Sequence, residues 1–164
     1  MHHSILKLYT PSPAEALELL TTPPQFRGLR ICPEALPPAF LLERALVDLK
    51  ESWRMPRLFC DEVASEIVGS GAFKSEPRSR TVEIGYGIAP ACRGRGFATA
   101  GITLLVEEAF SSGFVDKVWA ETALTNGASQ RVLEKAGFVV YSLGDSDEGP
   151  MKRWANWKTC SSLV

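Results

Sequence analysis

The stretch from residue 81 to residue 113 limits the possible folds more than any other, because a strand pattern passes into a helix pattern across a glycine-rich turn. Residues 81–89, TVEIGYGIA, alternate between two faces as a half-buried strand does. Residues 97–113 carry apolar residues at helical spacing and end at a glycine. This sequence of elements predicts strand–helix–strand units in the second half of the chain.

The turn between these elements, CRGRG at 92–96, predicts an anion site. Gly94 and Gly96 allow backbone conformations that are closed to other residues, and they let a ligand touch the main chain. The amides of the following helical turn have no intrahelical partner and lie at the positive end of the helix dipole, which suits phosphate. Arg93 and Arg95 add positive charge at the rim. The alternative is a tight strand–helix turn that holds no ligand.

The remaining patterns predict a single α+β domain that spans residues 1–164. The proline-rich residues 23–38 are expected to be a loop, and short turns after residues 62 and 74 indicate an antiparallel meander. We expect strands at 5–10, 57–62, 66–74, 81–89, 116–123, 139–144 and 151–158, and helices at 12–22, 39–53, 97–113 and 126–138.

Composition excludes several classes of protein. The net charge of −1 argues against a nucleic-acid binder that relies on bulk charge. No apolar run approaches the roughly 18 residues that cross a bilayer, and no signal peptide is visible, so we expect a cytoplasmic protein without membrane contact. The four cysteines have no metal-binding spacing and are expected to be reduced. Both histidines lie at the N-terminus, which excludes hydrolases with a Ser/His or Cys/His pair.

Two motifs resemble the GNAT superfamily of N-acetyltransferases. Residues 93–98, Arg-Gly-Arg-Gly-Phe-Ala, match the superfamily's acetyl-CoA motif, Arg/Gln-x-x-Gly-x-Gly/Ala, at every defined position. NGASQRVLEKAGF at 126–138 and the EIGY strand at 83–86 are similar to the ribosomal-protein N-terminal acetyltransferase branch, of RimJ/RimL type. The resemblance covers residues 57–157.

The resemblance implies a mixed, mostly antiparallel sheet of about seven strands, with helices on both faces. The sheet would be splayed between its fourth and fifth strands, at 81–89 and 117–123, and acetyl-CoA would enter the gap. The pyrophosphate would lie on the amides of Arg93, Gly94, Arg95, Gly96, Phe97 and Ala98, the pantetheine beside Ile88 and Ala89, and Asn126 near the pantetheine or acetyl group. No metal is implied, and related proteins occur as monomers and homodimers.

The implied reaction is direct transfer of acetyl from acetyl-CoA to a primary amine, on a protein N-terminus or a small molecule. The amine must first lose a proton. Glu83 is the first candidate for the base, because its strand face also carries Gly85 and Gly87 and would look into open space. Glu121 on the neighbouring strand is the rival, and Glu148 is a third possibility. The alternative for Glu83 is an ordinary ion pair.

The leaving thiolate needs a proton donor, which many superfamily members supply with a tyrosine seven residues after the asparagine. Leu133 occupies that position here. Ser129 is the implied substitute, although a serine in a first helical turn also satisfies backbone amides. Tyr86 and Tyr141 are alternatives. The missing tyrosine supports a second hypothesis, a non-catalytic domain that binds or senses acyl-CoA.

The sequence does not identify the acceptor amine, because a fold does not fix a substrate. Residues 20–56 would form the acceptor side, with the proline-rich loop as a mobile lid and Trp53 as the best candidate for lining a pocket. Cys92 is expected to pack in the core and not to act as a nucleophile.

Overall fold

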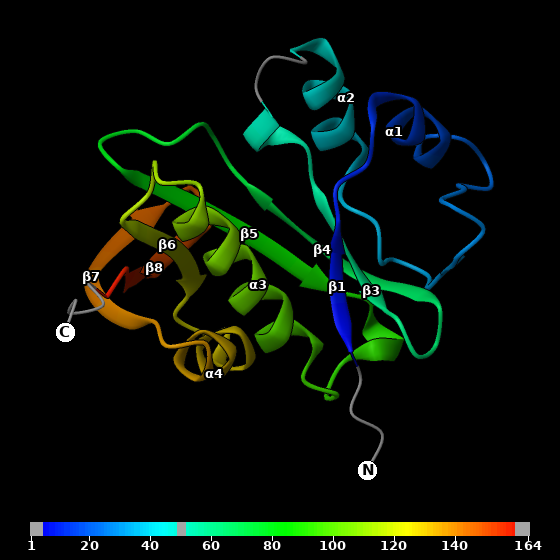
Figure 1. Cartoon of the computed structure of the whole chain (residues 1–164). Helices are drawn as coiled ribbons and strands as arrows, with labels where there is room; N and C mark the ends of the chain where they lie inside the picture. Colours follow the sequence, from blue (N-terminus) through cyan, green and yellow to red (C-terminus); the bar gives the residue numbers. More distant parts are fainter. Residues whose placement is uncertain (1–4, 49–51, 160–164) are drawn as a thin grey trace, which may run out of the picture.

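The computed structural model describes residues 5–48 and 52–159 as an α+β fold with one mixed sheet (Figure 1). The order of strands and helices predicted from the sequence is confirmed, apart from differences in the N-terminal third. The strands are β1 Leu6–Tyr9, β2 Arg30–Ile31, β3 Arg57–Asp61, β4 Glu66–Phe73, β5 Thr81–Ile88, β6 Lys117–Ala123, β7 Val139–Ser146 and β8 Gly149–Trp157. The α-helices are α1 Pro13–Leu19, α2 Ala39–Val47, α3 Phe97–Ser111 and α4 Gly127–Lys135, and two 3₁₀ turns are Ser52–Arg54 and Pro90–Cys92.

The sheet has the order β1-β3-β4-β5-β6-β8-β7, and β2 pairs with β4 in addition. Neighbouring strands along this order are antiparallel, except for the parallel pair of β5 and β6. A parallel pair needs a crossover, and α3 supplies it.

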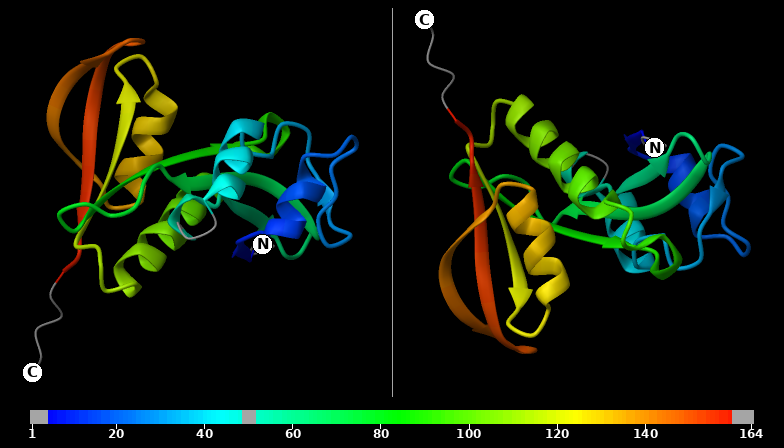
Figure 2. Two further views of the ribbon diagram at one scale, coloured as in Figure 1. Left: turned by 90° about the horizontal axis from the view of Figure 1, so that it is seen from above. Right: turned by 90° about the horizontal axis from the view of Figure 1, so that it is seen from below.

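The sheet divides at the β5–β6 pair. The pairing of these two strands begins at Thr81 opposite Lys117 and ends at Glu83 opposite Trp119. Beyond that point β5 stays paired with β4 up to Ile88, whereas β6 stays paired with β8. The two halves of the sheet therefore diverge, as Figure 2 shows, and the expected splay is confirmed.

Helices cover both faces of the sheet (Figure 2), with α3 on one face and α2 on the other. The helix α3 packs very closely, because a Cβ on Gly101 would lie 2.4 Å from Cε2 of Phe59 on β3. The start of α1 is fixed by a capping box, in which the N–H of Glu15 donates to Oγ of Ser12 and the N–H of Ser12 donates to Oε2 of Glu15.

Three expectations about the N-terminal third were wrong in detail. The first helix ends at Leu19, earlier than predicted, and the expected loop at 23–38 contains the two-residue strand β2. A strand this short has no periodic pattern of its own and forms only because it can pair with β4. The second helix ends at Val47, since Asp48 has φ −124° and ψ 82°, and Ser52–Arg54 is a separate turn. Residues 49–51 of that predicted helix lie outside the described residues.

Candidate active site

The glycine turn opens the N-terminus of α3. Gly94 has φ 75° and Gly96 has φ 82°, both in the left-handed region that favours glycine. A Cβ on either residue would meet no atom within 4 Å, so the backbone conformation and not crowding requires glycine here. Gly96 is the N-cap residue of α3, and no side chain caps the helix. The first amides of α3 thus remain available to a ligand.

These amides face a cleft of about 470 Å³, named the α3 cleft, between β5, the turn, α3 and α4. Most of the residues that the sequence pointed to for cofactor binding line it: Ile88, Arg93, Gly94, Gly96, Phe97, Ala98, Asn126 and Ser129. Thr99 and Lys135 also line the cleft, and the sequence reasoning did not find them. The splayed sheet thus brings the end of β5, the turn with the start of α3, and α4 to one cleft.

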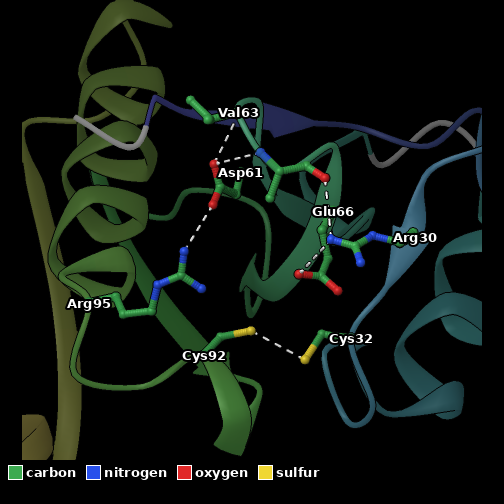
Figure 3. A network of polar contacts seen from close by, with 8 residues as sticks. Arg30, Cys32, Asp61, Val63, Glu66, Cys92 and Arg95 are labelled. Atoms are coloured by element: carbon green, nitrogen blue, oxygen red, sulfur yellow. Dashed lines mark hydrogen bonds and ion pairs between the residues drawn. The ribbon is translucent and has the colours of Figure 1, made fainter. Parts of the chain in front are cut away.

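Arg95 and Ala89 do not line the α3 cleft. Arg95 donates to Oδ2 of Asp61 at 3.2 Å (Figure 3). Its guanidinium lies 4.6 Å from the ring centroid of Phe97. Asp61 is 2% exposed, and its other oxygen accepts from the N–H of Val63 at 3.1 Å. Arg95 therefore ties the turn to the end of β3. Ala89 is fully buried, and its N–H donates to the carbonyl oxygen of Val68 at 2.9 Å.

Cys92 lies beneath the turn, where its Sγ is 3.2 Å from Sγ of Cys32 (Figure 3). Both residues are buried free thiols. Burial, followed by the contact with Cys32, raises the pKa of Cys92 to about 11. Because the thiolate is the nucleophilic form, this geometry fits a packing residue better than a nucleophile.

Two residues at the start of α4 face the α3 cleft from the other half of the sheet. Oδ1 of Asn126 accepts from the N–H of Ser129 at 3.1 Å and caps the helix. The hydroxyl of Ser129 is hydrogen-bonded to the hydroxyl of Tyr86 on β5. Burial raises the pKa of Tyr86, and the bond to Ser129 partly opposes that rise. The two hydroxyls therefore connect β5 to the start of α4 across the gap that opens where β5 and β6 part.

A second cavity of about 510 Å³, named the α2 cavity, lies between α2, the loop at 34–38 and strands β4 and β5. The α2 cavity and the α3 cleft share four lining residues: Tyr86, Gly87, Ile88 and Arg93. The end of β5 therefore borders both spaces. This arrangement suits a reaction between two bound molecules.

None of the three predicted carboxylates lines either cavity. Glu83 forms an ion pair with Lys74, which does line the α2 cavity. Glu121 accepts from Nε of Arg153 at 2.8 Å, and the two residues are paired in register across β6 and β8. Glu148 is exposed in the turn between β7 and β8.

Glu34 is a carboxylate that does line the α2 cavity, and the sequence reasoning did not find it. It lies in the loop and has a φ of 65°, which is uncommon for a residue with a side chain. No sequence signal distinguishes it from other loop glutamates, because its place depends on how the loop packs over β4 and β5.

The remaining candidates, Leu133, Trp53 and Tyr141, do not line either cavity. Leu133 is fully buried, and Trp53 packs against Phe73 at 4.8 Å between ring centroids. Tyr141 is 41% exposed on β7, with Nζ of Lys117 4.7 Å from the centroid of its ring. In the part of the chain that the structure describes, no group of three or more His, Cys, Asp or Glu side chains could hold a metal ion. Among residues 5–48 and 52–159, none of the helices has the length and hydropathy needed to span a bilayer.

The mixed sheet with its parallel β5–β6 pair and four helices is the α+β fold of the GNAT acetyltransferases. The family model described as acetyltransferase (GNAT) domain matches residues 9–139, and the chain therefore belongs to the GNAT acetyltransferases, which are enzymes of the acyltransferase class. GNAT homologues bind CoA or acetyl-CoA. No curated protein matches the sequence.

Solved structures share the fold at low sequence identity. A GNAT-family acetyltransferase from Bacillus anthracis matches with TM-score 0.58 and 18% identity, over 62% of this chain and 65% of that one. A microcin C7 self-immunity acetyltransferase in complex with acetyl-CoA and AMP matches with TM-score 0.68 and 17% identity, over 93% and 92%. A ribosomal-protein-S5-alanine acetyltransferase from Vibrio fischeri matches with TM-score 0.68 and 13% identity, over 97% and 98%.

Proposed function

We propose that this protein is an N-acetyltransferase that moves the acetyl group of acetyl-CoA directly to a primary amine. The observation that carries the proposal is the meeting of the α3 cleft and the α2 cavity at Tyr86, Gly87 and Ile88. Two substrates, one bound in each space, would meet there without a covalent enzyme intermediate. Holding both reactants in this geometry would supply much of the catalysis.

Acetyl-CoA would occupy the α3 cleft. Its pyrophosphate would lie on the amides of residues 93–98, the segment that contains the two left-handed glycines, Gly94 and Gly96. The pantetheine would run along the end of β5 beside Ile88, where the pairing with β6 has ceased. Ala89 would support this edge from the core. Asn126 caps α4 with its oxygen and would present its amide nitrogen to the pantetheine.

Tyr86 and Ser129 would protonate the leaving thiolate. Their hydroxyls are hydrogen-bonded to each other, and both residues line the α3 cleft. A tyrosine with a raised pKa stays protonated near neutral pH and can donate. Tyr86 would then supply the hydroxyl that Leu133 cannot, with Ser129 orienting it.

Two carboxylates are candidates for the base that would take the proton of the amine. Glu34 lines the α2 cavity, and Glu83 lies beside it through its ion pair with Lys74. Glu121 is less well placed, since Arg153 engages it on β8. Replacing each of these glutamates by glutamine would show which one is the base. The variant that lacks the base would lose the acidic limb of its pH–rate profile.

The resemblance of residues 83–86 and 126–138 and the fold match to an S5-alanine acetyltransferase support a place near the ribosomal-protein N-terminal acetyltransferase branch. Cys32, Cys60 and Cys92 are free thiols, which supports a reducing compartment such as the cytoplasm.

The first test is binding and turnover. Acetyl-CoA at a hundred times its Kd should stabilise the protein by about 2.7 kcal/mol, seen as a rise in Tm. An acceptor panel should then reveal thiol release that depends on an amine. The absence of any Tm shift at millimolar acetyl-CoA would refute the proposal.

The second candidate is a non-catalytic domain that binds or senses acyl-CoA. The buried Leu133, at the position of the usual tyrosine, favours it. This candidate predicts a rise in Tm with acetyl-CoA but no amine-dependent thiol release, which is the result that distinguishes the two.

A further inference from the structure

We propose that the acceptor is an amine that also carries a carboxylate and an apolar side chain, and that Arg44 binds the carboxylate. The inference rests on the proposed acetyl transfer and specifies its substrate class. The α2 cavity combines an apolar wall with cationic residues at its rim. This combination suits an apolar amino acid better than a polyamine.

Arg44 lies on the face of α2 that borders the cavity. Phe40, Leu41 and Arg44 all line it, as expected for residues three and four apart on one helix. Arg44 Nη2 donates to the carbonyl oxygen of Lys74 at 3.4 Å, which holds the guanidinium at the rim. It forms no ion pair with any carboxylate within residues 5–48 and 52–159. Its remaining N–H groups can bind a carboxylate through two parallel hydrogen bonds.

The charges around the α2 cavity favour one anionic group and one amine. Three lining residues are cationic, namely Arg44, Lys74 and Arg93, and Glu34 is the anionic one. The ion pair with Glu83 offsets the charge of Lys74. Arg93 donates through Nε to the carbonyl oxygen of Ile88 at 3.3 Å and is shared with the α3 cleft, where a phosphate would engage it.

Arg44 is therefore the cation left for the acceptor itself, and Glu34 is the carboxylate left for a single ammonium group. An acceptor with several ammonium groups would meet Arg44 as a like charge and would find only Glu34 as a partner in the lining, which disfavours it.

The wall of the cavity is apolar. Phe40 is 60% exposed beside it, and Leu36, Leu41 and Phe73 line it as well. An aromatic side chain exposed at a cavity mouth is suited to contact an apolar part of a ligand. A volume of about 510 Å³ accommodates an amino acid with a large side chain.

The experiment compares matched acceptors in a thiol-release assay with saturating acetyl-CoA. Phenylalanine, leucine and methionine are each paired with their amides, and phenethylamine, spermidine and kanamycin complete the panel. The amides have the larger fraction of neutral amine at pH 7.5, so their intrinsic reactivity is favoured. A preference of the protein for the free acids must then come from recognition of the carboxylate.

We expect kcat/KM for at least one free acid to exceed that of its amide by about tenfold or more, the scale of a charged hydrogen bond. Arg44→Gln should remove this preference by lowering kcat/KM for the acid about tenfold to a hundredfold while leaving the amide unchanged. Arg78→Gln, on the exposed loop between β4 and β5 and outside both cavities, is the control and should change neither.

The outcomes separate the inference from the proposed function. Faster turnover of the amides or of the polyamines by the wild type would overturn the inference and leave the acetyl transfer intact. An equal loss for acid and amide in Arg44→Gln would do the same. No turnover of any amine, together with no rise in Tm from the acids in the presence of CoA, would refute both.

Discussion

Tyr86→Phe is the substitution that tests the catalytic reasoning most directly. It removes one oxygen atom from the place where the α3 cleft and the α2 cavity meet, and it leaves the ring that packs there. The hydroxyl of Ser129 loses its partner on β5. One neutral hydrogen bond contributes about 1 kcal/mol to the free energy of unfolding, so Tm should fall by only about 2–4 °C for a domain of this size.

The expected effect on catalysis is much larger than the effect on stability. Loss of a positioned general acid lowers kcat by about a hundredfold to ten-thousandfold, and a hundredfold corresponds to about 2.7 kcal/mol of activation free energy. The KM for acetyl-CoA should change less than about threefold, because the amides after Gly96 that would hold the pyrophosphate are untouched. Steady-state thiol release, with both substrates varied, measures each quantity.

The pH dependence adds a second readout. Burial raises the pKa of Tyr86 above its ordinary value near 10, so the acid form is fully present at lower pH and is lost only as the pH rises through that raised pKa. The kcat of the wild type should therefore have no alkaline limb below about pH 10 from this group. Tyr141→Phe, which changes a tyrosine that lines neither cavity, is the matched control and should leave kcat unchanged. A Tyr86→Phe variant with a kcat within twofold of the wild type would refute the assigned role.

Three further predictions concern the turn, the core and α1. Gly96→Ala should lower the free energy of unfolding by about 1–2 kcal/mol, because the residue has a left-handed φ of 82°, and calorimetry should show weaker binding of acetyl-CoA. Gly113→Ala is the control: its φ of 77°, at the far end of α3, predicts the same loss of stability with unchanged binding. Gly101→Ala should destabilise by about 1–3 kcal/mol in urea unfolding, because its Cβ would lie 2.4 Å from Phe59, and Phe59→Leu should partly rescue it; additive losses would contradict this packing. Arg27, with the Ser12 amide, lowers the pKa of Glu15 to about 2, so its ionised form stabilises the fold above pH 4.5 and that stabilisation is lost as the pH falls toward 2. The Tm difference between wild type and Glu15→Gln should accordingly be constant from pH 6 to 8 and shrink below pH 4.5, and a constant difference down to pH 2 would contradict it.

Much of the α3 cleft could be predicted because its parts are local in sequence. The left-handed φ of Gly94 and Gly96, the start of α3 and the cap of α4 by Asn126 each depend on a few neighbouring residues. The direction in which the Arg95 side chain points could not be predicted from neighbouring residues. Its partner Asp61 is 34 positions away, and only the packing of β3 under the turn brings the two together.

The sequence by itself determined the strand–turn–helix unit and the alternation of the strands. These properties follow from backbone preferences and side-chain periods, which act over one or two turns. Only the tertiary structure decided that Tyr86 meets Ser129 across the splay, that Glu83 is held by Lys74, and that Arg44 and Glu34 face one cavity. The contact of Tyr86 with Ser129 depends on the point at which β5 and β6 part. Glu83 meets Lys74 because the two residues face each other across the β4–β5 pair, and Arg44 and Glu34 line one cavity because α2 and the loop at 34–38 pack over these strands.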